Sequence, residues 1–199
     1  MSLTSKKQQQ KPGEGVDIIL SVPYYSQFLD LDNKMDMLTS CGMTCVKMLL
    51  DYYNIKSLSL NELVTKGKTE GGYGKSGWVH DYFVNLLISF NLESHREEKI
   101  NTEEEIKEIK ISLDKGNPII CSVAKRLFDK RMFHMILLIG YEASDNGEVL
   151  GFYYHNPEST SREAGRDCYV SIADFAEYWR HMAIFASPNL KINLTKPNK

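Results

Sequence analysis

Hydrophobic residues in the first half of the chain recur with the period of an α-helix. The first long stripe follows the spacing i, i+3, i+4, i+7 and consists of Val46, Leu49, Leu50 and Tyr53. Thr39 or Ser40 supplies a residue suited to an N-cap before this stripe, and Asn54 supplies a stop after it. The pattern therefore predicts an amphipathic helix between these positions.

Three further helices and one strand are predicted in the same half. The sequence SLNE at 59–62 matches a capping box, and Ser76 precedes a hydrophobic stripe over 77–90. Another stripe, over 101–116, opens at an Asn-Thr pair and closes at a glycine. Residues 16–23 read as an extended strand that ends at a proline.

From residue 117 onward, short apolar runs replace the helical stripes. The predicted strands are NPIICSVA (117–124), HMILLIGYEA (134–143), EVLGFYYHNP (148–157), CYVSI (168–172) and HMAIFAS (181–187). Asp145-Asn146-Gly147 is a hairpin signal, and Ser171 and Asp174 cap a helix over IADFAEYW. Helices followed by a mostly antiparallel sheet predict an α+β domain.

The chain has the size and composition of one globular domain. Its 199 residues are 42% hydrophobic, and we expect a single domain over 16–189. Residues 1–15 read as a flexible leader without the apolar core of a signal peptide, and 190–199 as a polar tail. Localisation is left open by these features.

Charge and cysteine content exclude several classes of protein. The net charge of −2, with both signs mixed along the chain, gives no case for binding nucleic acid or an anionic membrane. No apolar run reaches the length that spans a bilayer. Four cysteines are too few for a disulfide scaffold of this size.

Two of these cysteines lie at the start of the first long helix. Cys41 falls at the helix N-terminus, where unpaired amides and the helix dipole favour a thiolate. Cys45 lies one turn further, about 40° around the helix and nearer the apolar stripe. Both residues also fit a simple role as small core residues. A metal site is not favoured, because Cys121 and Cys168 have no partner at ligand spacing.

A cysteine nucleophile needs a base, an orienting group and an oxyanion donor. Among the histidines, His134 opens the most apolar run of the second half, so a rigid central strand holds it. Asn156, after the next strand, can orient its ring, while the adjacent His155 points to the opposite face. Gln27 can offer its side-chain amide beside the Cys41 backbone N–H. We interpret His80, His95 and His181 as surface residues.

The order Gln27, Cys41, His134, Asn156 and the sequence segments around these residues resemble those of the papain-like cysteine peptidases. The similarity is closer to the bacteriocin-processing (double-glycine leader) cysteine peptidases and their stand-alone relatives. It is carried by VPYYSQ, SCGMTCVKMLLDYY, HMILLIGY and HNP, with further likeness in LDKGNPIICSV and SIADFAEYW. The resemblance extends over about residues 22–187 and implies a papain-like fold with the nucleophile at a helix N-terminus.

By this resemblance, Cys41 is the nucleophile, His134 the general base and acid, Asn156 the orienting residue and Gln27 the oxyanion donor. The chain departs from the family pattern in three places. Ser40 stands where an acidic or amide residue is usual, and Asn156 stands where aspartate is more frequent. The loop after Gln27 is long and carries Asp30, Asp32 and Asp36, which we expect to form a solvated acidic rim rather than a calcium site.

The sequence thus predicts a cysteine hydrolase that cleaves a peptide or amide bond without metal or organic cofactor. Two alternatives stay open: an inactive domain of the same fold that binds peptides, and an acyltransferase or transpeptidase. The resemblance implies a peptide or cell-wall-linked peptide substrate. It also makes a bacterial protein plausible, secreted or at the cell surface if a signal peptide has been removed, and otherwise cytoplasmic.

Overall fold

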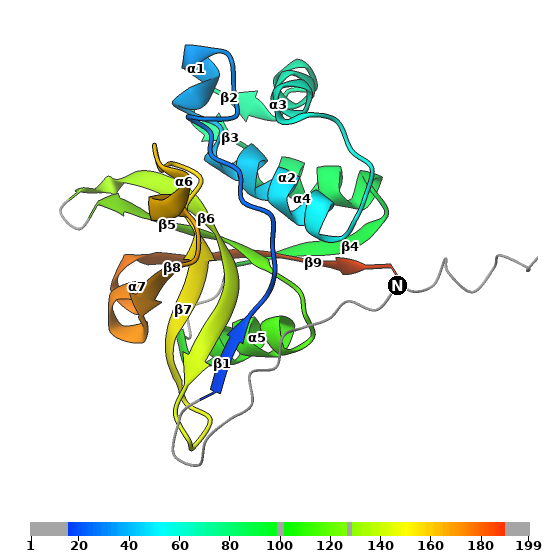
Figure 1. Cartoon of the computed structure of the whole chain (residues 1–199). Coiled ribbons are helices and arrows are strands. Elements are labelled where there is room, and N and C mark those ends of the chain that lie inside the picture. Colours follow the sequence, from blue (N-terminus) through cyan, green and yellow to red (C-terminus); the bar gives the residue numbers. More distant parts are fainter. Residues whose placement is uncertain (1–15, 99–101, 127–128, 190–199) are drawn as a thin grey trace, which may run out of the picture.

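The computed structural model of the chain describes residues 16–98, 102–126 and 129–189. It has the predicted α+β architecture, with helices on an antiparallel sheet (Figure 1). The predicted leader, 1–15, and tail, 190–199, lie outside the described residues.

The main sheet has seven strands and carries the second half of the chain. Its order is β4-β9-β5-β6-β7-β8, with β1 paired to the far end of β6, and every pair is antiparallel. The strands are β1 Val16–Ile19, β4 Leu92–Glu98, β5 Ile119–Arg126, β6 Asp129–Ala143, β7 Val149–His155, β8 Cys168–Ser171 and β9 Trp179–Pro188. Two short strands, β2 Tyr73–Gly74 and β3 Gly77–Trp78, form a separate hairpin.

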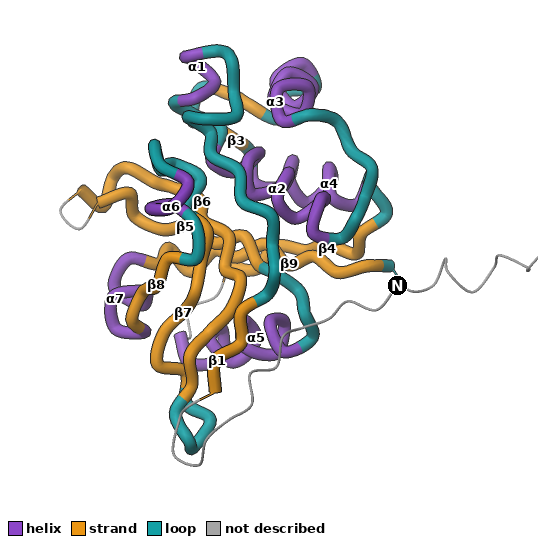
Figure 2. The backbone as a smooth tube through the Cα atoms, in the orientation of Figure 1, coloured by secondary structure: helices purple, strands orange, loops and turns teal. Residues whose placement is uncertain are grey.

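The first four helices gather on one side of this sheet, and the later three are spread around it (Figure 2). The N-terminal group, in the upper part of the view, is α1 Lys34–Met37, α2 Cys41–Tyr52, α3 Leu60–Thr69 and α4 His80–Ser89. The later helices are α5 Thr102–Asp114, α6 Arg162–Gly165 and α7 Ile172–Tyr178. None of these described helices has the length and apolar character needed to cross a membrane.

Helix α2 joins the helical group to the sheet. Val46, Leu49 and Leu50 of its predicted stripe are fully buried, Tyr53 is partly buried at the C-cap, and the helix packs on β6. The helix ends at Tyr52, and Asn54 then adopts the left-handed conformation at φ 55°, which asparagine tolerates better than most residues. The start of α2 is therefore held against the central strand of the domain.

Several predicted boundaries are wrong. The helix predicted over 77–90 begins only at His80, because Gly77, at φ 98°, closes the β2–β3 hairpin instead. Strand β4 was not predicted, because it is an edge strand whose side chains are mostly polar and only Leu92 is buried. The strand expected from residue 134 starts at Asp129, and the short helices α1 and α6 were missed.

Candidate active site

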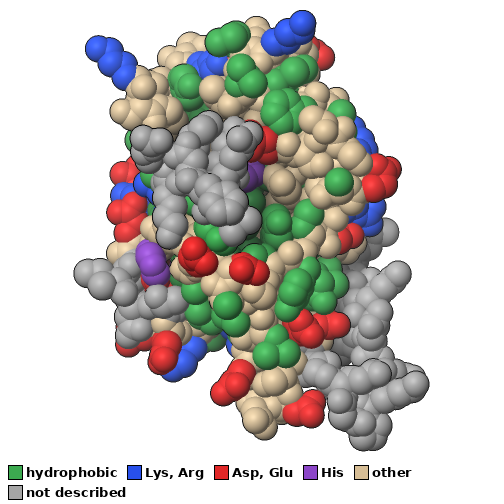
Figure 3. Space-filling model, turned by 90° about the vertical axis from the view of Figure 1, so that its left-hand side faces the viewer, with side chains coloured by type: hydrophobic (Ala, Val, Ile, Leu, Met, Phe, Trp, Pro, Cys, Tyr) green, Lys and Arg blue, Asp and Glu red, His purple; other side chains and the backbone are tan. Residues whose placement is uncertain are grey.

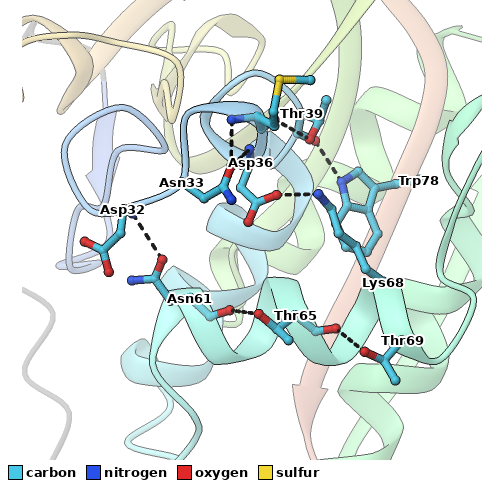
Figure 4. A network of polar contacts seen from close by, with 10 residues as sticks. Asp32, Asn33, Asp36, Thr39, Asn61, Thr65, Lys68, Thr69 and Trp78 are labelled. Carbon is cyan, nitrogen blue, oxygen red and sulfur yellow. Dashed lines mark hydrogen bonds and ion pairs between the residues drawn. The ribbon is translucent and has the colours of Figure 1, made fainter.

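Cys41 is the first residue of α2, and a network of polar contacts fixes the segment that precedes it (Figure 4). Asn33 caps α1 through its side chain, and Asp36 forms an ion pair with Lys68 of α3. The carbonyl of Thr39 accepts a hydrogen bond of 2.7 Å from the indole of Trp78. The chain thus enters α2 along one defined path.

The first turn of α2 packs closely against its neighbours. A Cβ atom added to Gly42 would lie 2.4 Å from the ring of Phe83 and 2.7 Å from the sulfur of Met135. Ser40 occupies the N-cap position, but its hydroxyl makes no capping bond and finds no partner among the described residues. The predicted N-cap position is confirmed, but the first amides of the helix are left without a side-chain acceptor from Ser40.

His134 lies on β6, opposite Val123 of β5, and its ring reaches Asn156. The ring nitrogen Nε2 is 2.8 Å from Oδ1 of Asn156. That same Oδ1 accepts the backbone N–H of Glu158 at 3.0 Å, which identifies the atom as the amide oxygen. Nε2 of His134 therefore carries a proton and donates it, and Nδ1 is left for Cys41.

The thiol of Cys41 and the ring of His134 lie close enough for each to shift the pKa of the other. Desolvation opposes the thiolate, but the hydrogen bond and charge of His134, with the Met135 backbone amide, lower the pKa of Cys41 overall. Desolvation also opposes the imidazolium, but contact with Cys41 and the charge of Glu158 raise the pKa of His134. These opposite shifts favour a thiolate–imidazolium pair.

Gln27 lies on a loop that contacts the Asn156 segment. Its backbone N–H donates to the carbonyl of Pro157 at 2.8 Å, and its side-chain NH₂ donates to the carbonyl of Met37 at 2.6 Å. The residue is 1% exposed, and its Oε1 finds no partner among the described residues. Because an NH₂ group has two hydrogens, one N–H remains for another acceptor.

The two loops that carry Gln27 and Asn156 are tied together although they are far apart in sequence. The hydroxyl of Tyr24 donates to the carbonyl of Asn156 at 2.8 Å. The hydroxyl of Ser26 donates to the carbonyl of Ser159 at 2.6 Å. These bonds fix the orienting amide relative to the loop before α2.

The acidic residues after Gln27 have specific partners rather than forming a solvated rim. Asp30 accepts the backbone N–H of Ser26 and forms an ion pair of 2.6 Å with Arg162. Asp36 binds Lys68, and only Asp32 is exposed. Among the described residues, no group of three His, Cys, Asp or Glu side chains is placed to hold a metal ion.

The remaining histidines take different positions. His155 is fully buried and hydrogen-bonds to the carbonyl of Val22, on the other side of the strand from Asn156. His95 is exposed and His80 is half-buried. His181 does not stand free in solvent as expected, because its ring bonds to the buried Glu105 at 2.8 Å.

The other cysteines differ from Cys41. Cys45 and Cys121 are buried, and desolvation raises the pKa of both thiols. Cys168 is half-buried, and its pKa is also raised by desolvation. None of the four is in a disulfide. Cys41 alone among them has a lowered pKa.

Sequence reasoning missed Glu158. Its Oε2 lies 3.7 Å from Nδ1 of His134, and its side chain is 17% exposed. The only signal in the sequence is its position two residues after Asn156. This spacing brings Glu158 to the ring of His134 only because the chain turns back at Asn156, which the sequence does not show.

A model of the Peptidase C39-like family matches residues 19–186. No curated protein matches the chain.

Three solved structures share the fold. A C39-like peptidase from Bacillus anthracis is 18% identical, with a TM-score of 0.62 over 87% of this chain and 98% of that one. A double glycine motif protease from an AMS/PCAT transporter, solved with the leader peptide, is 16% identical, with a TM-score of 0.56 over 86% and 94%. The peptidase domain of Streptococcus ComA is 17% identical, with a TM-score of 0.53 over 76% and 93%.

Proposed function

Because this chain belongs to the Peptidase C39-like family, we propose that it is an active cysteine peptidase with Cys41 as its nucleophile. The family resemblance and the papain-like α+β fold predicted from the sequence are both confirmed. The proposal concerns activity, the roles of individual residues and the substrate.

The observation that carries the proposal is the mutual influence of Cys41 and His134. A thiol at a helix N-terminus lies near an imidazole whose Nε2 is fixed by Asn156, and each group shifts the pKa of the other. The pKa of the thiol is lowered and that of the ring is raised, which favours a thiolate paired with an imidazolium. A structural cysteine in a core has no need of such an arrangement.

In the proposed reaction, the Cys41 thiolate attacks the carbonyl carbon of a peptide bond. The backbone N–H of Cys41 and the remaining side-chain N–H of Gln27 stabilise the resulting oxyanion. His134 gives its Nδ1 proton to the leaving amine as the C–N bond breaks, leaving a thioester on Cys41. His134 then takes a proton from water, which attacks the thioester and restores the thiolate as the acid product leaves.

We propose a peptide segment as the substrate. The protease of the AMS/PCAT transporter was solved in complex with a leader peptide, and it shares this fold. Leu38, three residues before the nucleophile, is a large apolar residue that remains exposed. Figure 3 shows a face on which hydrophobic side chains reach the surface between scattered acidic ones. Such a surface suits a peptide with apolar side chains.

A peptide carrying an electrophilic vinyl sulfone tests the proposal directly. We expect one adduct per chain, mapped to Cys41 by peptide mass fingerprinting. Cys41→Ala removes this adduct, and Cys168→Ser, a control at a half-buried thiol with raised pKa, keeps it. Adducts spread over several cysteines, or none at Cys41, would overturn the proposal.

A peptide library then separates the possible reactions. Cleavage into two peptides with a new carboxylate identifies hydrolysis. Transfer of the acyl part to an added amine identifies an acyltransferase. Binding without turnover identifies an inactive peptide-binding domain.

A further inference from the structure

A carboxylate lies beside the histidine of the site, near the ring nitrogen that Asn156 does not occupy. Glu158 follows Asn156 by two residues and places Oε2 at 3.7 Å from Nδ1 of His134. The backbone N–H of Glu158 donates to the Asn156 side chain at 3.0 Å, so the loop holds Glu158 close to the histidine. Its side chain is mostly shielded from solvent, as is that of His134.

The two nitrogens of the ring have different neighbours. Nε2 is committed to the amide oxygen of Asn156, which is uncharged. Because Nε2 is taken, Nδ1 is the nitrogen left for Cys41, and the Glu158 carboxylate lies 3.7 Å from it. When the ring is an imidazolium, two negative groups therefore share its Nδ1 side.

We propose that Glu158 is a positioning residue that supplies the negative charge that Asn156 lacks and keeps His134 protonated beside Cys41. This inference rests on the proposed function, because it assigns the charge balance of the same thiol and imidazole. Glu158 acts through His134 and not on the substrate.

The charged and titratable neighbours of the pair determine the sign of the effect. Cys41 comes from α2, with Cys45 one turn further along, and Glu158 comes from the loop after β7. The Glu158 charge raises the pKa of His134 and also works against the Cys41 thiolate. Removing it should therefore shift both titrations to lower pH.

The test substitutes Glu158→Gln, which keeps the size and the backbone bond and removes the charge. The thiolate is titrated by its absorbance near 240 nm as a difference from Cys41→Ser. The ring is titrated by NMR of ¹³C-histidine-labelled protein, with the His134 signal assigned by its loss in His134→Gln. We expect the pKa of His134 to fall by about one unit and the pKa of Cys41 to fall by less.

Two further variants separate charge from shape. Glu158→Asp keeps the charge, so it should restore part of the His134 shift. Glu163→Gln removes an exposed carboxylate of α6 whose partner is Ser161, and it should leave the pKa values of His134 and Cys41 unchanged.

The outcomes distinguish this inference from the proposed function. If wild-type Cys41 titrates like an ordinary thiol, the proposed peptidase chemistry fails. If the wild-type pair is present but Glu158→Gln leaves both titrations unmoved, or moves them in opposite directions, only the role of Glu158 is refuted.

Discussion

Converting Asn156 to aspartate should raise the pKa of His134 more than any other single substitution at the site. Asn156 already uses its oxygen to accept two donors, the ring N–H of His134 at 2.8 Å and the Glu158 amide at 3.0 Å. An aspartate accepts both bonds equally well, because its oxygens are acceptors only. The substitution therefore adds a charge with little change of geometry.

The size of the effect follows from these distances. Two unit charges about 4 Å apart interact by about 4 kcal/mol at an effective dielectric constant of about 20. Desolvation of the new carboxylate and repulsion from Glu158 offset part of this. One pKa unit corresponds to about 1.4 kcal/mol, so we expect the His134 pKa to rise by about 1–2 units.

The sign is fixed because a negative charge stabilises the protonated ring and disfavours the thiolate. The alkaline limb of the pH profile of kcat/KM should move to higher pH, and the acid limb should follow by less. NMR of the histidine ring gives the same shift without substrate. Asn61→Asp serves as the control, since Asn61 also accepts a backbone amide, from Asp32, but lies on α3. An unchanged or lowered His134 titration in Asn156→Asp would refute the reasoning.

Three other predictions concern the oxyanion donor, the strand contacts and a buried histidine. Gln27→Ala should lower kcat by about 10²–10³-fold with little change of KM, measured on a peptide identified from the library. Gly140→Ala should cost about 3 kcal/mol or more in urea unfolding, because its Cβ would lie 1.9 Å from the Ile18 carbonyl oxygen; a loss below about 1 kcal/mol would contradict this. His155 has a pKa lowered by burial, so the unfolded chain binds the proton more readily. The contribution of His155 to the free energy of unfolding is full above about pH 6.5 and is lost as the pH falls. In His155→Gln, the difference between the free energies of unfolding measured at pH 7.5 and at pH 5 should therefore be smaller than in the wild type.

The fold was predictable where one periodicity dominates. The stripe of α2, the Asp145–Gly147 hairpin and the capped helix α7 each rest on local patterns that tertiary contacts reinforce. Strand β4 could not be predicted, because its polar residues form a strand only through pairing with β9. The β2–β3 hairpin was hidden because the helical stripe predicted over 77–90 overlaps β3, whereas α4 begins only at His80.

The site was predictable as a set of residue types in order, but not in its electrostatic detail. Helix and strand positions indicated Cys41 and His134, and in the structure each shifts the pKa of the other. The partners of Asp30 and Asp36 depend on Arg162 and Lys68, from segments that the sequence gives no reason to join. Glu158 was invisible for the same reason, because its importance comes from how Asn156 folds the chain back.

The last strand of the chain has a consequence for the newly made protein. Strand β9 inserts between β4 and β5, so the centre of the sheet is closed only when residues 179–188 have been synthesised. Until then β5 lacks one neighbour, and the histidine strand beside it rests on an incomplete support. A newly made chain therefore gains full support for β5, and through β5 for the histidine strand β6, only after residues 179–188 have joined the sheet.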